Sequence, residues 1–91
     1  MFVVVFYDIS DDRKREFIAN RLLSMGLTRI QRSVFIGRGG VALAKDIHRF
    51  VSRHIDHGDS VVVLVVPAES VRNMLIAGRE IDIGGAGVRV L

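Results

Sequence analysis

Two runs of consecutive apolar residues stand out in the chain, and both are rich in valine. The first is FVVVF at 2–6, and the second lies within SVVVLVV at 60–66. Each is too short to span a membrane, and β-branched and aromatic side chains favour strands. Because neither run alternates with polar residues, the pattern predicts two strands that are buried on both faces.

Two further segments carry apolar residues at helical spacing. A helix is expected from the acids at 11–12 to about Met25, because aspartates suit a helix N-terminus and Gly26 is a typical stop. A second helix is expected over 41–55, with basic side chains on its outer face. Between them, 28–37 alternates and predicts either one bent strand or two short strands broken near Ser33.

The remainder of the chain predicts short elements. After Pro67 we expect a helical segment that stops at Gly78, a brief strand over 79–83 and a glycine turn over 84–87. The last residues, 88–91, can add a strand to a sheet edge of this chain or of a neighbour. We predict that 79–91 is a C-terminal strand extension that pairs with a second subunit.

The order strand, helix, strand or strand pair, helix, strand indicates an α+β fold with two helices on one face of a mainly antiparallel sheet. Residues 1–91 are expected to form a single ferredoxin-like domain, a βαββαβ sandwich with an additional C-terminal strand. The first strand is central in that topology, which agrees with the burial predicted for it.

Composition narrows the functional classes. Hydrophobic residues make up 49% of the 91 residues, a high share for one small domain, so we expect an oligomer. The chain has no cysteine, which excludes disulfides and thiolate sites and fits a cytoplasmic protein without membrane association. Thirteen Lys and Arg against ten Asp and Glu give a net charge of +3, with arginine strongly preferred. Arginine suits phosphate oxygens, although most basic side chains on a domain are solvated.

Asp8 is the first candidate functional residue, because it follows directly on the first apolar run. A rigid sheet holds a side chain at a strand end, while the following loop leaves room for a ligand. An oxygen ligand of this kind suits a hard cation such as Mg²⁺, which often takes only one or two protein carboxylates. In a symmetric dimer, one aspartate per chain becomes two.

Two motifs resemble the CRISPR-associated protein 2 family. They are YDISDDRKR at 7–15, after a hydrophobic strand, and GLTRIQRSVF at 26–35, after a helix. The resemblance implies a ferredoxin-like homodimer whose C-terminal strands join the partner's sheet. It also implies the small subunit of the spacer-acquisition complex, with CRISPR-associated protein 1 as partner. Several members of the family are metal-dependent nucleases on RNA or duplex DNA.

By resemblance, Asp8 is the catalytic and Mg²⁺-binding residue, with one copy from each subunit in a cleft on the dimer axis. Arg15, Arg29 and Ser33 then correspond to nucleic-acid-binding positions, and Tyr7 and Phe35 to supporting ones. The same residues also have structural interpretations: the arginines as solvated side chains, Ser33 as a bulge residue, and the two aromatic residues as core.

Other signals are weaker. Phe17 stands where some family members have a basic residue, which favours DNA bridging over a nuclease lining. Asp11 and Asp12 can add to a metal site, but helix capping is the simpler role. The three histidines lack zinc-ligand spacing. Lys45, Arg49 and Arg53, one turn apart, form either a solvated helix face or a track for a duplex backbone.

Three functions therefore stay open. The first is a DNA-binding adaptor in CRISPR adaptation, an antiviral defence system, with an endonuclease centre at Asp8. The second is a stand-alone toxin-type endoribonuclease with the same fold. The third is a ferredoxin-like binding module without catalysis, which would need exposed aromatic residues to stack RNA bases.

Overall fold

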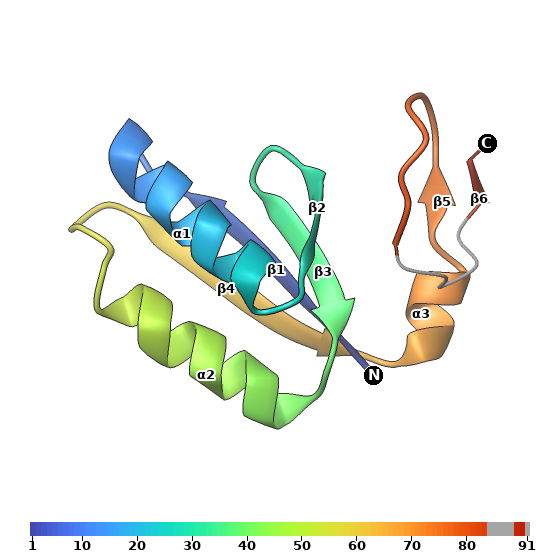
Figure 1. Ribbon diagram of the computed structural model, residues 1–91. Coiled ribbons are helices and arrows are strands. Elements are labelled where there is room, and N and C mark those ends of the chain that lie inside the picture. Colours follow the sequence, from blue (N-terminus) through green and yellow to red (C-terminus); the bar gives the residue numbers. More distant parts are fainter. Residues whose placement is uncertain (84–88, 91) are drawn as a thin grey trace.

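A computed structural model describes residues 1–83 and 89–90 of the chain. Its main body is a four-stranded antiparallel sheet, in the order β2-β3-β1-β4, with two helices against one face (Figure 1). This confirms the ferredoxin-like α+β prediction and the central position of the first strand. The elements are β1 (Phe2–Asp8), α1 (Asp12–Ser24), β2 (Thr28–Gln31), β3 (Val34–Arg38), α2 (Val41–Ser52) and β4 (Ser60–Val66).

Local chemistry sets the ends of α1. Asp11 is its N-cap and accepts a hydrogen bond from the Lys14 backbone N–H at 2.8 Å. After the helix, Gly26 adopts a φ of 91°, a left-handed conformation that glycine reaches without strain. The segment that follows forms two strands, β2 and β3, joined by a turn at Arg32 and Ser33. Of the two alternatives left open for 28–37, the strand pair is therefore the correct one.

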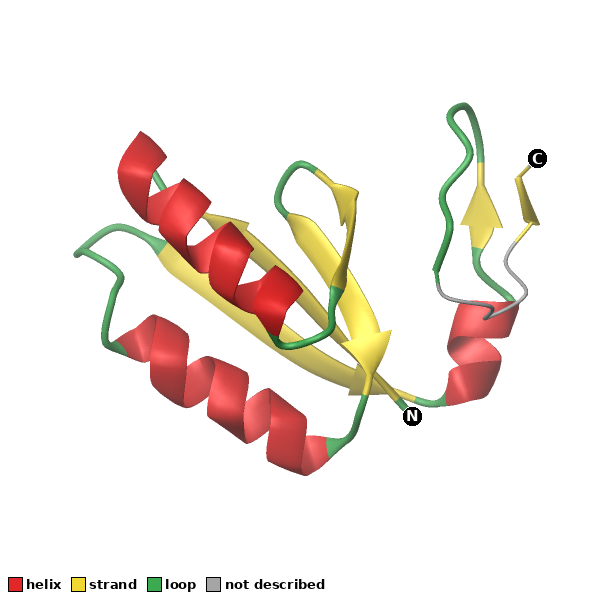
Figure 2. Cartoon of the chain, in the orientation of Figure 1, coloured by secondary structure: helices red, strands yellow, loops and turns green. Residues whose placement is uncertain are grey.

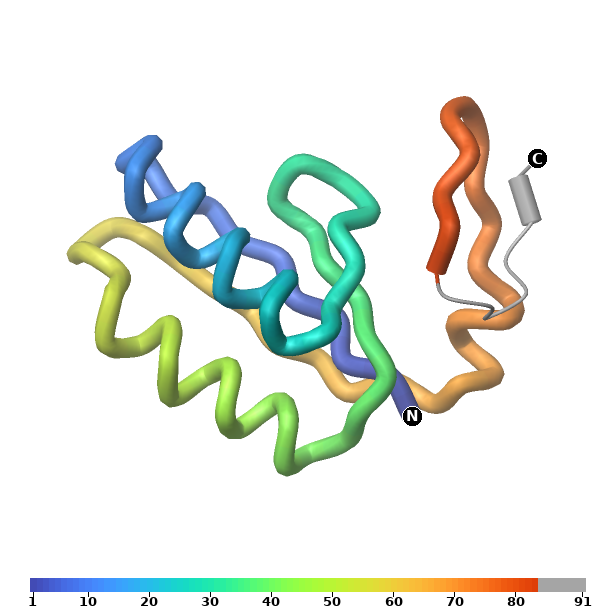
Figure 3. Tube along the Cα trace, viewed as in Figure 1, coloured from blue at the N-terminus to red at the C-terminus, as the bar shows by residue number. Residues whose placement is uncertain are grey.

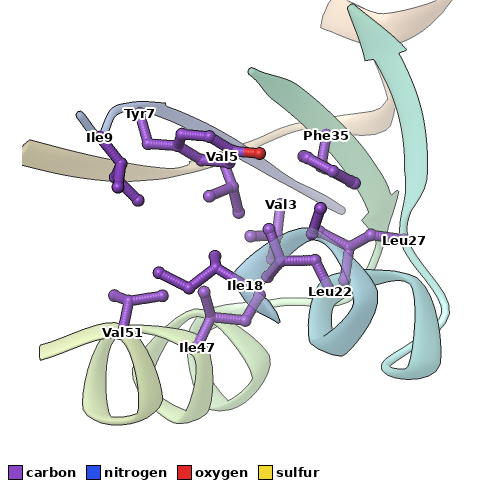
Figure 4. Close-up of a cluster of buried hydrophobic side chains, with 11 residues drawn as sticks. Val3, Val5, Tyr7, Ile9, Ile18, Leu22, Leu27, Phe35, Ile47 and Val51 are labelled. Atoms are coloured by element: carbon purple, nitrogen blue, oxygen red, sulfur yellow. The ribbon is translucent and has the colours of Figure 1, made fainter. Parts of the chain in front are cut away.

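The main core lies between the sheet and the two helices. Alternate residues of β1, namely Val3, Val5 and Tyr7, face this layer, together with Phe35 of β3. They pack on the inner faces of the helices, as Figure 4 shows for Ile18, Leu22, Ile47 and Val51. Because Val3 and Val5 have no exposed surface, the centre of this face of the sheet is covered.

The opposite face of the sheet contradicts the prediction of strands buried on both faces. Phe6 of β1 is 38% exposed, and Val62 and Leu64 of β4 are 40% and 45% exposed. These side chains alternate with the buried ones, so they lie on the face away from α1 and α2. Within the described residues, this part of the face has no covering layer.

The C-terminal segment covers the other end of this face. It consists of α3 (Ala68–Arg72), β5 (Leu75–Ile76) and the irregular residues up to 83, and it stands apart from α1 and α2 in Figures 2 and 3. Val71 and Ile83 of this segment pack on Phe2 and Ile36 to form a second core cluster. The open part of the face is therefore the end that leads to Asp8.

Two predictions for this segment are wrong. The strand expected over 79–83 is irregular chain, and the helical segment expected up to Gly78 ends at Arg72 and is followed by β5. Pro67 starts the helix, but only five residues follow in helical conformation, too few for an independent helix. The predicted glycine turn at 84–87 lies outside the described residues.

The last described residues, β6 (Arg89–Val90), pair in parallel with β5 of the same chain. Pairing of the C-terminal extension with a second subunit stays a prediction. None of the helices in the described part of the chain is both long and apolar enough to cross a membrane.

Candidate nucleic-acid and metal site

A hollow of about 500 Å³ lies where β1 ends, between the start of α1 and the turn from β2 to β3. It brings together nearly all the predicted site residues, since Tyr7, Asp8, Arg15, Arg29 and Ser33 all line it. Phe35 lies beneath, in contact with the Tyr7 ring. The remaining lining residues are Ile9, Asp12, Glu16 and Arg32.

Asp8 is exposed at the end of the open sheet face. It continues the row of Val4 and Phe6 along β1 and lies opposite Ser60 of β4. Its carboxylate makes no hydrogen bond or ion pair with any described residue. The carboxylate oxygens are consequently available to a cation or to water.

Arg15 is largely engaged within its own chain. Its Nη1 donates to the carbonyl oxygens of Ile9 and Ser10, at 2.9 and 3.1 Å, and its Nη2 pairs with Asp12. These bonds hold the loop between β1 and α1 against the first turn of the helix. Arg15 therefore positions the loop that follows Asp8, and it also lines the hollow.

Arg29 is held by the turn that follows it. Its Nε and Nη2 donate to the Arg32 carbonyl oxygen at 3.0 and 2.8 Å, and its guanidinium lies 5.3 Å from the centre of the Phe35 ring. That ring in turn stacks with Tyr7 at a centroid distance of 6.1 Å. The ring and the two hydrogen bonds together hold the Arg29 cation at the rim of the hollow.

Tyr7 forms the floor of the hollow and is only 7% exposed. Its hydroxyl, drawn in red in Figure 4, is buried and makes no hydrogen bond of standard geometry with the described residues, although Arg29 lies close enough to interact with it. Burial raises the pKa of the phenol, and the Arg29 cation opposes this in part. A buried donor without a hydrogen bond of standard geometry is uncommon, and here it lies at the candidate site.

The acids next to Asp8 have structural roles. Asp11 caps α1 and Asp12 pairs with Arg15. Both carboxylates therefore have partners within the described residues, whereas the Asp8 carboxylate has none. Asp59, which the sequence interpretation missed, accepts from the backbone N–H groups of Ser10 at 3.2 Å and Asp56 at 2.9 Å. The bond from Asp56 and that from Ser10 lower the pKa of Asp59. They also connect the loop after β1 to the loop before β4.

Within one chain the oxygen donors are too few for a closed metal site. Among the described residues no group of three or more His, Asp or Glu is arranged to hold a metal ion. Instead of serving as a ligand, His54 packs with Phe17 and Phe50 at centroid distances of 5.1 and 4.7 Å. One exposed carboxylate still suits Mg²⁺, which keeps several of its waters and dehydrates reluctantly.

Sequence comparison identifies a protein family that this chain matches. A family model described as "CRISPR associated protein Cas2" matches residues 1–74. A protein of Aeropyrum pernix named "CRISPR-associated endoribonuclease Cas2" is 42% identical over 85 residues, covering 92% of each chain. A "CRISPR-associated endonuclease Cas1/endonuclease Cas2 fusion" of Thermoproteus tenax is 40% identical over 55 residues, which are 60% of this chain and 21% of the fusion.

Solved structures agree with this family. A Cas2 crystal structure from Streptococcus pyogenes superposes with a TM-score of 0.66 at 25% identity, covering 81% of this chain and 95% of that one. A hypothetical protein of Thermus thermophilus, TT1823, superposes with a TM-score of 0.63 at 35% identity, over 72% and 80% of the two chains.

Proposed function

The chain belongs to the CRISPR-associated protein Cas2 family, and from that premise we propose that it is a nucleic-acid-binding homodimer of CRISPR adaptation. We further propose that the dimer has a Mg²⁺-dependent phosphodiesterase centre in its cleft. The observation that carries the proposal is the position of Asp8, an unpaired exposed carboxylate at the end of an uncovered apolar sheet face.

The uncovered face supports the dimer. Phe6, Val62 and Leu64 lie side by side on β1 and β4, since Phe6 is directly opposite Val62 and Val4 is opposite Leu64. Contiguous apolar side chains of this size are costly to leave in water. A second copy of the chain, related by a two-fold axis, would cover this face with the same face of its own sheet.

Such an arrangement would give Asp8 a symmetry mate. Asp8 continues the row of Phe6, so two sheets packed through this row, with the two-fold axis running along the strands, would bring the two carboxylates to the same end of the interface. Together they would hold Mg²⁺, and the bound cation would supply Lewis acidity toward a phosphodiester and activation of water. Arg29 and Arg15, at the rim of the hollow, would orient the phosphate, and Ser33 can donate to one of its oxygens.

The fusion protein of Thermoproteus tenax supports a partner. In that protein one chain carries both names, Cas1 and Cas2, so the two parts are held together covalently. We propose that this chain binds a Cas1 protein non-covalently and serves as the small subunit of the spacer-acquisition complex.

A second candidate is a stand-alone endoribonuclease with the same Asp8 centre. The name of the Aeropyrum pernix relative, which includes endoribonuclease, favours RNA as its substrate. The two candidates differ in substrate and partner but share the centre. A non-catalytic binding module is the alternative to both.

The decisive experiment compares the wild type with Asp8→Asn on two substrates, single-stranded RNA and linear duplex DNA, each with Mg²⁺ and with EDTA. Asp46→Asn is a matched control, because Asp46 is exposed on α2 and pairs only with Arg49. We expect Asp8→Asn to lower cleavage at least ~100-fold, the scale for losing a group that stabilises developing charge. Calorimetric Mg²⁺ titration should lose its binding signal in the same variant only.

Different outcomes separate the candidates. Cleavage that survives Asp8→Asn would disprove the centre. Salt-sensitive binding of duplex DNA without cleavage of either substrate would leave the adaptor role and remove the ribonuclease. Cleavage of RNA alone, unaffected by a Cas1 protein, would select the stand-alone enzyme.

A further inference from the structure

A second hollow, of about 420 Å³, lies beside the Asp8 hollow at the outer edge of the sheet. Its lining comes from β2, from the turn after β2 and from the C-terminal segment. The lining residues are Arg29, Ile30, Gln31, Arg32 and Arg79. Arg29 and Arg32 also line the Asp8 hollow, so the two hollows adjoin through these arginines.

The three arginines differ in the number of hydrogen bonds that hold their guanidinium groups. Arg29 is fixed by its two hydrogen bonds to the turn carbonyl. Arg79 reaches across from the C-terminal segment and donates through Nη2 to the Ile30 carbonyl oxygen at 3.4 Å, a long bond. The Arg32 side chain is exposed and makes no hydrogen bond or ion pair with the described residues. Most N–H groups of the three guanidinium groups therefore make no hydrogen bond with the described residues and are available to an anion.

The charge of this hollow differs from that of its neighbour. The Asp8 hollow contains three acids, Asp8, Asp12 and Glu16, besides its arginines. The outer hollow has three arginines and no acid among its lining residues. A site of this kind suits an anion with several oxygens, and guanidinium forks match phosphate in particular.

We propose that Arg29, Arg32 and Arg79 bind the phosphodiester backbone of a nucleic acid whose neighbouring phosphate lies at the Asp8 hollow. The proposal rests on the nucleic-acid binding in the proposed function and adds the path that the strand takes, around the β2–β3 turn. A protein partner is disfavoured because three adjacent arginines would each require an acidic side chain, whereas successive phosphates supply the charge at regular spacing.

Binding at this hollow links two parts of the fold. Arg29 and Arg32 belong to the sheet, whereas Arg79 belongs to the segment that packs on the opposite face through Val71 and Ile83. A phosphate bridging Arg79 to the other two would replace one long hydrogen bond by charge-assisted ones. Nucleic-acid binding therefore fastens the C-terminal segment to β2.

The test measures the affinity of the full chain for fluorescent linear duplex DNA and single-stranded RNA, by anisotropy, over a range of salt concentrations. The variants are Arg32→Gln and Arg79→Gln, and the control is Arg72→Gln. Arg72 is exposed in the same C-terminal segment but does not line the hollow. Each hollow variant should bind about 3-fold more weakly, with its salt slope reduced by about one, whereas the control matches the wild type.

Hydrogen exchange gives an independent readout. Nucleic acid should slow amide exchange at 75–82 in the wild type and in Arg72→Gln, but not in Arg79→Gln. If Arg79→Gln binds and exchanges like Arg72→Gln, the proposal is overturned even though the wild type binds. If the wild type binds neither nucleic acid, the nucleic-acid part of the proposed function fails with it. Asp8→Asn should leave the Arg79 effect intact, so a failure of the metal centre alone is distinguishable.

Discussion

The two faces of the four-stranded sheet are built from similar apolar side chains but differ in what covers them. On the helix side, Val3, Val5 and Phe35 have no exposed surface, whereas on the other side Phe6 and Leu64 are 38% and 45% exposed. The residues of the two sets alternate along the same strands. A valine-rich run therefore predicts a strand between two layers, but it does not say whether the second layer belongs to the same chain.

Polar groups at the end of β1 repeat this contrast. Tyr7 faces the helix side, where it is buried against Phe35 and Arg29. Asp8, the next residue, faces the open side, and its carboxylate pairs with no residue in the part of the chain that the structure describes. Consecutive residues thus face opposite sides of the sheet, Tyr7 as the floor of the hollow and Asp8 as an exposed carboxylate, because side chains alternate along a strand.

The largest expected difference between the faces is in stability. Phe35→Ala removes a fully buried ring and should lower the free energy of unfolding by about 3–5 kcal/mol, since a cavity remains in a layer closed on both sides. Phe6→Ala removes the same side chain from a partly exposed site and should cost about 1 kcal/mol in the monomer. Chemical denaturation at a low protein concentration measures both.

This pair of variants can also contradict the comparison. Equal losses for Phe6→Ala and Phe35→Ala in the monomer would mean that the open face is covered within the chain. A loss for Phe6→Ala that grows with protein concentration would instead show that the face is covered by a second copy.

The next effect concerns association. Leu64→Lys places a charge on the exposed apolar face at β4, and in a symmetric dimer it does so twice. We expect the dimer to dissociate at least ~100-fold more readily, because each buried ammonium would be unpaired, while the monomer keeps its fold. Leu23→Lys is the matched control, since Leu23 is 46% exposed but lies on α1. Sedimentation equilibrium measures the dissociation constants.

An unchanged dissociation constant for Leu64→Lys would exclude this face as the interface. Weakening by Leu23→Lys in place of Leu64→Lys would move the interface to the helix side. Circular dichroism of each variant at the same concentration confirms that the monomer is folded.

The sequence was sufficient for most of the fold because its signals are local. Asp11 as a cap and Gly26 as a stop place α1 within a residue or two of its observed ends. The expected strand over 79–83 failed because alternation in a short segment is weak evidence when neighbouring packing decides the conformation. Ile83 is buried in the second core cluster, but it packs from irregular chain.

The candidate site was predictable as a set of residues but not as an arrangement. The motifs led to Asp8, Arg15 and Arg29, which share one hollow. That Arg15 is occupied by loop carbonyls depends on the path of the backbone, which residue spacing does not specify. Arg79 was missed because it is about 50 residues distant from its neighbours in the hollow, and only the packing of the C-terminal segment brings them together.

The smallest effect is expected for Tyr7→Phe, which tests the helix-facing side of the sheet at the end of β1. Because burial raises the pKa of Tyr7, the unfolded chain loses this proton first as the pH rises above ~10. The part of the stability that depends on this titration is therefore fully present below that pH and is lost as the pH rises through the pKa of the folded state. The wild type should thus lose stability above pH ~10 relative to Tyr7→Phe. At neutral pH the variant should be as stable as the wild type or up to about 1 kcal/mol more stable, since the hydroxyl makes no hydrogen bond of standard geometry.

Denaturation of both proteins at several alkaline pH values isolates this effect, because the raised pKa of Lys14 is common to both. Tyr7 is the single tyrosine of the chain, so phenolate absorbance reports its titration directly. If the stability of the two proteins instead changes in parallel with pH, the phenol is accessible to water and this prediction is wrong.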